Sequence, residues 1–259
     1  MLPMARARTH GEVAETLRRA GCVAADDEAR ELADSADSAA ALDAMVARRV
    51  AGEPLAWITG RTVFCGLELI VDPGVFVPRW QSEALARAAS VLLPERGVAV
   101  DLCTGAGSIA AVLAARRPTA EVLATELDPV AVACAQRNGV HVAQGDLFAP
   151  LPARLRGRVD VLTAVAPYVP RIALHRLPRD VLAFEPSIAL DGGEDGLDVV
   201  RRIVAESVDW LGAGGDVLLE VGSDQCDDVA RLLERARYHA PSVIEDADGD
   251  PRGVRAQRV

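Results

Sequence analysis

A strand that runs directly into a glycine turn is the feature that most constrains the fold of this chain. Residues 98–102 form an apolar run typical of a buried strand, and Gly105 and Gly107 follow it closely. Glycines at such positions let the backbone turn sharply into a helix, whose first amides then face a ligand. The feature therefore predicts a strand, turn and helix that together bind a ligand at one edge of a sheet.

From Gly97 onward, segments typical of strands alternate with segments typical of helices. The predicted strands are residues 98–102, 121–125, 140–143, 159–164 and 216–221, and the predicted helices are 108–116, 129–138, 196–211 and 225–236. This alternation predicts an α/β fold, with a parallel sheet and helices on both of its faces. The last segments, 242–245 and 254–259, are expected to add an antiparallel pair.

The chain before this alternation is expected to hold small accessory elements. Residues 11–51 carry apolar residues at helical spacing and predict two or three helices. Residues 62–71 predict a β-hairpin around Gly66, and Ser82 is the expected N-cap of the next helix. We therefore predict a helical N-terminal lobe (1–51), a linker with the hairpin (52–80) and a catalytic domain (81–259).

Composition excludes several classes of function. A net charge of −10 and an aromatic content of 3% argue against nucleic acid or an anionic membrane as a partner. All 28 basic residues are arginine, which excludes a lysine Schiff base and a P-loop lysine. The five cysteines lack CxxC spacing and no apolar leader is present, so a cytoplasmic protein is expected. No metal is expected, because no cluster has ligand spacing.

Taken alone, the glycine turn fits two cofactors. Residues 105–110 match the G-x-G-x-x-A fingerprint of dinucleotide-binding proteins. Glu126 ends the second predicted strand, where a carboxylate can accept hydrogen bonds from ribose hydroxyls. Both NAD and S-adenosylmethionine (SAM) carry such a ribose, so further residues must decide between them.

Three features favour SAM. Asp101 ends the first strand directly before the turn, where methyltransferases place an acid. Asp146 follows the third strand, where an acidic loop meets the adenine amine. The tetrad Val165-Ala166-Pro167-Tyr168 follows the fourth strand, and amino-methylating enzymes use a tetrad ending in Pro-Tyr to hold a planar nitrogen against SAM. A dehydrogenase has no need of such a tetrad.

At these residues the chain resembles the HemK/PrmC family, the protein-(glutamine-N5) methyltransferases that modify the Gly-Gly-Gln loop of peptide release factors. The resemblance also covers residues 51–60, 64–66, 71–83, 185–186 and 189–197. It implies the class I SAM-dependent methyltransferase fold, a Rossmann-like, seven-stranded and mostly parallel sheet. SAM would be the cofactor, and S-adenosyl-L-homocysteine the product.

The resemblance also implies roles for particular residues. The cofactor-binding residues would be Asp101, Cys103, Thr104, Gly105, Ala106, Gly107, Glu126, Leu127, Asp146 and Leu147. Residues 103–107 would wrap the methionine part of SAM, Glu126 the ribose, and residues 146–147 the adenine. The acceptor pocket would be formed by Val165, Ala166, Pro167 and Tyr168, with Arg79 and Glu185 as further substrate-binding residues. His175, in a predicted polar loop over 171–179, joins Tyr168 and Glu185 as a candidate base.

Val165 departs from the family pattern, which has Asn or Asp at this position. In the family, the Asn oxygen and the next backbone carbonyl accept the two N–H groups of the glutamine amide, and the Tyr packs over the amide plane. Valine cannot accept a hydrogen bond, which predicts inefficient transfer to glutamine through that geometry. Cys103 is a second departure, since many members have glycine there.

These observations leave several hypotheses for function. The leading one is a SAM-dependent transferase with a changed acceptor, such as a small molecule or natural product of secondary metabolism. Displacement at a SAM-derived sulfonium is one route for that reaction. The alternatives are a protein-(glutamine-N5) methyltransferase acting on a release-factor-like Gly-Gly-Gln loop, a SAM-binding protein without transfer activity, and an NAD-linked oxidoreductase.

Overall fold

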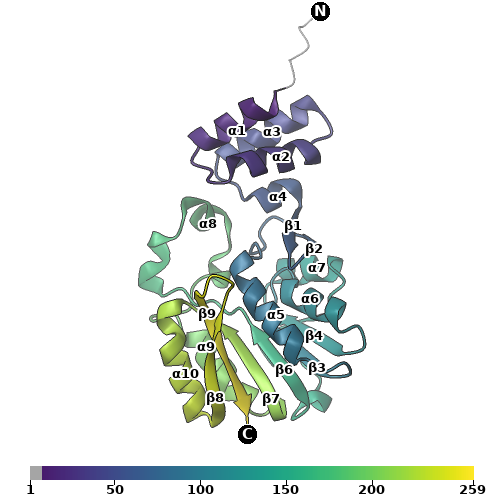
Figure 1. Cartoon of the computed structure of the whole chain (residues 1–259), viewed down its shortest axis with the longest axis vertical. Coiled ribbons are helices and arrows are strands. Elements are labelled where there is room, and N and C mark those ends of the chain that lie inside the picture. Colours follow the sequence, from purple (N-terminus) through teal and green to yellow (C-terminus); the bar gives the residue numbers. More distant parts are fainter. Residues whose placement is uncertain (1–7) are drawn as a thin grey trace, which may run out of the picture.

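A computed structural model describes residues 8–259 and places a group of helices beside an α/β unit. The first elements are α1 (His10–Arg19), α2 (Ala25–Ser35), α3 (Ala39–Val50), α4 (Leu55–Thr59), β1 (Arg61–Phe64) and β2 (Leu67–Ile70). Helices α1 to α3 pack around their own apolar cluster and lie at one end of the molecule, apart from the main sheet (Figure 1). The predicted helices and hairpin are present, whereas the division into three domains stays a prediction.

Within residues 8–259, a sheet of seven strands has the order β5-β4-β3-β6-β7-β9-β8. The strands are β3 (Val98–Leu102), β4 (Glu121–Glu126), β5 (Val142–Gln144), β6 (Val159–Ala164), β7 (Leu211–Glu220), β8 (Tyr238–Glu245) and β9 (Pro251–Arg258). The first five are parallel, and β9 pairs antiparallel with both β7 and β8. The predicted α/β class and the antiparallel pair are both confirmed.

Helices cover both faces of this sheet and supply its two main apolar clusters. Helices α5 (Glu83–Leu92) and α6 (Ser108–Arg116) pack on one face, and α9 (Asp198–Ser207) and α10 (Cys226–Arg235) pack on the other. Helix α7 (Pro129–Arg137) packs along β4 and β5. No helix among residues 8–259 is long and apolar enough to cross a membrane.

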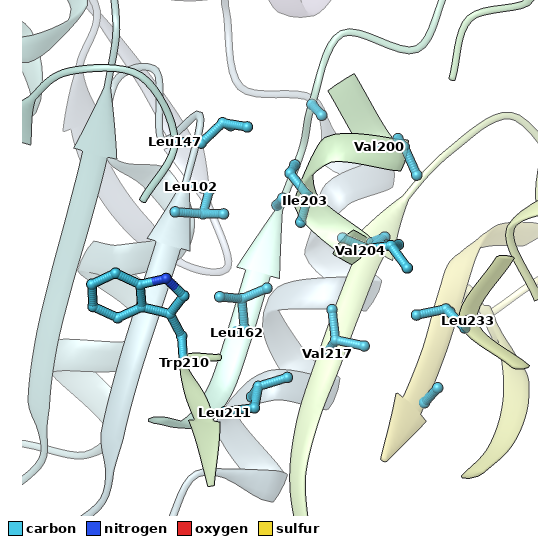
Figure 2. Packing of buried hydrophobic residues seen from close by; sticks show 14 of the residues in the cluster. Leu102, Leu147, Leu162, Val200, Ile203, Val204, Trp210, Leu211, Val217 and Leu233 are labelled. Carbon is cyan, nitrogen blue, oxygen red and sulfur yellow. The ribbon is translucent and has the colours of Figure 1, made fainter. Parts of the chain in front are cut away.

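The α9 face shows how the central strands are buried (Figure 2). Leu162 of β6 is fully buried in the cluster that contains Val217 of β7 and Ile203 and Val204 of α9. Close packing of this kind fixes β6 and β7 relative to one another. The carboxyl ends of these two strands are thereby held side by side.

We expect Leu162→Ala to destabilise the fold by about 3 kcal/mol, because the deletion leaves a cavity in a site with no exposed surface. Urea unfolding followed by circular dichroism measures this loss. The control is Val91→Ala on α5, where the side chain is 77% exposed and the effect should stay below about 0.5 kcal/mol. Equal effects of the two substitutions would contradict the packing described here.

Three local predictions were wrong. The helix predicted over 196–211 ends at Ser207, and Leu211 already belongs to β7, where it pairs with Val159 across a register shift. Several glycines near residue 213 weaken the sequence signal for a strand, so this first half of β7 was not predicted. Pairing with β6 stabilises it. Ser82 occupies the predicted N-cap position of α5 but does not cap the helix with its side chain: it ends a 3₁₀ turn (Trp80–Ser82), has helical backbone angles and makes no side-chain capping hydrogen bond.

The segment predicted as a polar loop over 171–179 also differs. It contains a 3₁₀ helix, η3 (Arg171–Arg176), and the start of helix α8 (Arg179–Phe184). Phe184 at the end of α8 makes an edge-on contact with the ring of Trp57, at 6.2 Å between ring centroids. This tertiary contact stabilises a short helix for which the local sequence carries no strong signal.

Candidate active site

A cavity of about 660 Å³ lies at the carboxyl edge of the parallel strands. Its wall includes residues that directly follow β3, β4, β5 and β6, together with residues 220–223 at the end of β7. This edge is where open α/β sheets bind ligands. The strand order therefore brings together residues that are far apart in sequence.

The cavity gathers most of the residues predicted for the site. Its lining includes Arg79, Asp101, Cys103, Thr104, Gly105, Ala106, Glu126, Leu127, Asp146, Leu147, Val165, Ala166, Pro167 and Tyr168. Gly107, Glu185 and His175 do not line it. Gly107 instead has a left-handed conformation before α6, where a Cβ atom would lie 2.7 Å from Val140.

Buried hydrogen bonds to Asp101 fix the loop after β3. The buried Asp101 carboxylate accepts hydrogen bonds from the hydroxyls of Thr104 (2.5 Å) and Thr163 (2.7 Å). Burial raises the pKa of Asp101 to about 6, although both hydroxyls act in the opposite direction. Cys103 has a positive φ of 54°, a conformation that favours glycine and accounts for the glycine of many family members.

Glu126 connects the end of β4 to the glycine turn. One carboxylate oxygen accepts a hydrogen bond from the Gly105 amide at 2.9 Å. The other accepts hydrogen bonds from the amides of Leu127 (2.7 Å) and Asp128 (3.0 Å). The carboxylate is therefore fixed in orientation at the cavity wall.

Asp146 and Leu147 line the cavity after β5, and an arginine that sequence reasoning missed joins them. Arg202 of α9 forms an ion pair with Asp146 at 2.6 Å, and both side chains are half exposed. Arg202 also lines the cavity. No local motif marks it, because it reaches Asp146 only through the packing of α9 on the sheet.

The backbone of the tetrad is clamped by the segment 189–197. The amide of Val169 donates to Leu190 O (3.1 Å), and the amide of Gly192 donates to Val169 O (2.9 Å). A Cβ atom at Gly192 would lie 2.7 Å from Pro167 O, so the close approach requires glycine. The family-like residues 189–197 thus position the backbone at the end of the tetrad, residues 167–169.

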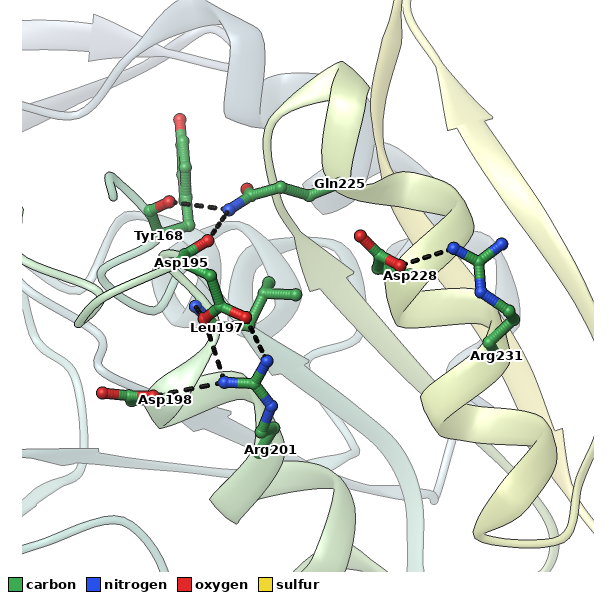
Figure 3. A network of polar contacts seen from close by, with 8 residues as sticks. All are labelled: Tyr168, Asp195, Leu197, Asp198, Arg201, Gln225, Asp228 and Arg231. Carbon is green, nitrogen blue, oxygen red and sulfur yellow. Dashed lines mark hydrogen bonds and ion pairs between the residues drawn. The ribbon is translucent and has the colours of Figure 1, made fainter. Parts of the chain in front are cut away.

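Gln225 completes this clamp from the other side (Figure 3). Its side-chain amide donates to Tyr168 O at 3.0 Å and to Asp195 O at 3.2 Å. The Asp195 carboxylate accepts from the Leu197 amide at 3.1 Å and pairs with Arg201, so it orders the start of α9. The tetrad and the α9 loop therefore form one rigid hydrogen-bonded unit.

The part of the cavity lined by the tetrad holds a second residue that sequence reasoning missed, Glu220. It is the last residue of β7, is 4% exposed and lines the cavity. The Tyr168 hydroxyl donates to its Oε1 at 3.5 Å, while Oε2 has no hydrogen-bond partner among the described residues. Burial raises the pKa of Glu220 to about 7. Burial, with the Glu220 charge, raises the pKa of Tyr168 to about 12.

Three further predicted residues are Arg79, Glu185 and His175, of which only Arg79 lines the cavity. The Arg79 guanidinium forms an ion pair with Glu185, whose side chain is 1% exposed. Burial raises the pKa of Glu185, and Arg79 opposes that shift. His175 is exposed on η3 and does not line the cavity, so the structure does not bring this candidate base to the site.

Comparisons with known proteins identify the family and the fold. The sequence profile of the methyltransferase small domain family matches residues 66–149. A release factor glutamine methyltransferase from Geobacter sulfurreducens is 37% identical over 221 residues, which cover 83% of this chain and 77% of the relative. A second, from Moorella thermoacetica, is 40% identical over 225 residues, or 82% of this chain and 77% of the relative.

The chain belongs to the release factor glutamine methyltransferase (HemK/PrmC) family. A crystal structure of a methyltransferase from Pyrococcus furiosus shows the same fold, with a TM-score of 0.53 at 20% identity over 75% of this chain and 90% of that one. The predicted class I fold, the methyltransferase activity and the SAM cofactor are therefore confirmed. The NAD interpretation of the glycine turn has no support from these relatives.

Proposed function

We propose that this enzyme methylates the side-chain amide nitrogen of glutamine in the Gly-Gly-Gln loop of a release factor. The observation that carries the proposal is the identity of 37% and 40% to proteins named release factor glutamine methyltransferases, over more than four fifths of the chain. The clamp on the tetrad backbone supports it, because a fixed tetrad is what holds a planar amide in line for transfer.

The residues after β3, β4 and β5 fit SAM in the adjoining part of the cavity. Gly105 has a positive φ, and a Cβ atom there would meet nothing within 4 Å, so open space lies beside this turn. We assign Glu126 to the ribose hydroxyls, residues 103–106 to the methionine part, and residues 146–147 to the adenine. When bound, SAM supplies a methyl group on a positively charged sulfur.

The residues after β6 are assigned to the acceptor. Tyr168 packs over the plane of the glutamine amide, and the Ala166 carbonyl accepts one of its N–H groups. Neither role needs the side chain at position 165. The clamp from Gln225 and Gly192 fixes the backbone on which both roles depend.

A small-molecule acceptor is the competing candidate, and Val165 is the observation that favours it. This side chain is half-buried and packs with the apolar cluster under α5 and α6, so it offers no hydrogen bond at the position of the family's Asn or Asp. An acceptor without an N–H group at that point would fit it. The relatives lend this candidate no support, and the same experiment tests both.

The test is methyl transfer from SAM to a purified release factor, followed by intact mass. We expect one added methyl group on the release factor and none on a matched variant whose Gly-Gly-Gln loop reads Gly-Gly-Ala. Equal methylation of both proteins, or none of either, would contradict the proposed function.

A further inference from the structure

The valine at the tetrad has a carboxylate as its neighbour on the next strand. Strands β6 and β7 are parallel, and Ala164 pairs with Leu219 at the end of their ladder. The following residues, Val165 and Glu220, therefore stand next to one another, roughly 5 Å apart between backbones. Side chains at matched positions of neighbouring strands project from the same face of a sheet.

The packing of the preceding residues supports this placement. Val161 and Leu218 belong to the same cluster as Val165, on the face covered by α5 and α6. Side chains alternate along a strand, so Glu220, two residues after Leu218, is expected on that face too. Leu162 and Leu219 belong to the opposite cluster. Glu220 thus lies beside Val165, at the position where the family pattern has Asn or Asp.

Glu220 is an incompletely paired carboxyl group in the cavity wall. The groups facing it are the hydroxyls of Tyr168 and Ser82 and the positive charge of Arg252 on β9. Oε2 is sealed from solvent and has no partner among residues 8–259. A buried carboxyl oxygen without a donor is costly, so an N–H group that reaches Glu220 is favoured there. Because Oε2 is sealed, the Glu220 side chain must turn toward the cavity to accept from a ligand.

The other acids near the cavity are already engaged. Asp101 accepts from two threonine hydroxyls, and Glu185 is paired with Arg79. Tyr168 has a pKa raised to about 12, which makes its hydroxyl a poor base near neutral pH. Glu185 Oε2 also lacks a hydrogen-bond partner, but Glu185 does not line the cavity. Among these groups, only Glu220 combines an unpartnered oxygen, a place in the cavity lining and the matching strand register.

We propose that Glu220 accepts the second N–H of the glutamine amide, in place of the side-chain oxygen that Val165 lacks, and takes up the proton that this nitrogen loses. The proposal rests on the proposed function, since it requires an acceptor with two N–H groups. One N–H is then received by the Ala166 carbonyl and the other by Glu220.

The step balances without a further reactant. The nitrogen–carbon bond forms as the sulfur–carbon bond breaks, the electron pair of that bond remains on sulfur, and the amide nitrogen gives one proton to the Glu220 carboxylate. The proton then passes to water. A carboxylate with a pKa of about 7 is well matched to receive a proton near neutral pH.

The test compares wild type, Glu220→Gln, Val165→Asn and the double variant in single-turnover methyl transfer to a release factor. Glu245→Gln is the control, since Glu245 ends β8 of the same sheet, is exposed and does not line the cavity. The affinity for SAM is measured for every variant by calorimetry. The rate of wild type and Glu220→Gln is also followed from pH 5 to 9.

We expect Glu220→Gln to lower the rate by about 100-fold or more, while SAM affinity stays unchanged. The wild-type rate should rise with pH up to about 7 and then level off, because the carboxylate must be ionised, and this rise should be absent in Glu220→Gln. In the Val165→Asn background the same substitution should cost less, because the new amide oxygen holds the N–H in line and the nitrogen can then give its proton to water directly.

Three outcomes would overturn the inference. One is a Glu220→Gln rate equal to that of Glu245→Gln. Another is a loss that appears only together with equally weakened SAM binding, which indicates a structural role. The third is a pH profile that Glu220→Gln leaves unchanged. If wild type transfers no methyl group to the release factor, the proposed function itself fails, and that result is distinct from all three.

Discussion

Glu126→Ala will weaken SAM binding by about 100-fold. The substitution removes the carboxylate assigned to the ribose hydroxyls, and hydrogen bonds to a charged group are worth about 1.5–3 kcal/mol each. It also leaves the amides of Gly105, Leu127 and Asp128 without their acceptor, which loosens the glycine turn. Two lost bonds to ribose correspond to about 3 kcal/mol, or two orders of magnitude in Kd.

Calorimetric titration with SAM measures this effect, and Glu121→Ala is the matched control. Glu121 begins the same strand, at the opposite end from the cavity, and pairs with the exposed Arg154. Its loss should leave SAM affinity within about twofold of wild type, because an exposed ion pair contributes little. A Glu126→Ala protein that binds SAM as tightly as Glu121→Ala would disprove the assignment of Glu126.

Arg79→Ala will destabilise the fold by about 3 kcal/mol and lower transfer activity. The substitution leaves the Glu185 carboxyl buried without its positive partner, and breaking such a pair costs about 3–5 kcal/mol. The lower end applies because Arg79 itself is 34% exposed. Activity falls as well, because Arg79 lines the cavity and its ion pair with Glu185 holds the segment after α8 against it.

The loss of folding stability caused by Arg79→Ala should grow as pH rises. Burial already raises the pKa of Glu185, and removal of Arg79 takes away the charge that opposes this shift. A carboxyl group with a raised pKa in the folded state favours folding at low pH and opposes it as pH rises through that pKa. Arg79→Ala should therefore be most destabilised, relative to wild type, at neutral and alkaline pH.

Urea unfolding at pH 5 and pH 8 measures both effects. Arg79→Ala/Glu185→Gln should recover much of the stability, because the uncharged amide is cheaper to bury. Arg87→Ala is the control for loss of an arginine: its pair with Glu83 lies on the surface of α5 and should contribute below about 1 kcal/mol. Equal losses from Arg79→Ala and Arg87→Ala would contradict the buried role of Glu185.

Local sequence signals were enough to predict which residues line the part of the cavity that we assign to SAM. A strand, a glycine turn and a helix follow one another without a gap, so Asp101 and Gly105 are placed by the backbone itself. Glu126 is likewise placed by the end of its strand. The tetrad was found from its Pro-Tyr pair, and the segment 189–197 from its resemblance to the family, although its clamping role appears only in three dimensions.

The remaining residues depend on contacts that no local pattern records. Glu220 becomes part of the site because β7 pairs with β6 in one particular register, and Arg202 because α9 packs beside Asp146. An acid ending an apolar strand is a weak signal until the neighbouring strand is known. Val165 considered alone therefore predicted a changed acceptor. With Glu220 beside it, Val165 is compatible with the family's acceptor, a glutamine amide.

Fragmentation mass spectrometry of a release factor, after reaction with wild-type enzyme and SAM, tests the central claim most directly. The account predicts one methyl group, located on the side-chain nitrogen of the glutamine in the Gly-Gly-Gln loop. A reaction that leaves this glutamine unmodified, while the enzyme converts SAM to S-adenosyl-L-homocysteine with a small-molecule extract, would contradict it.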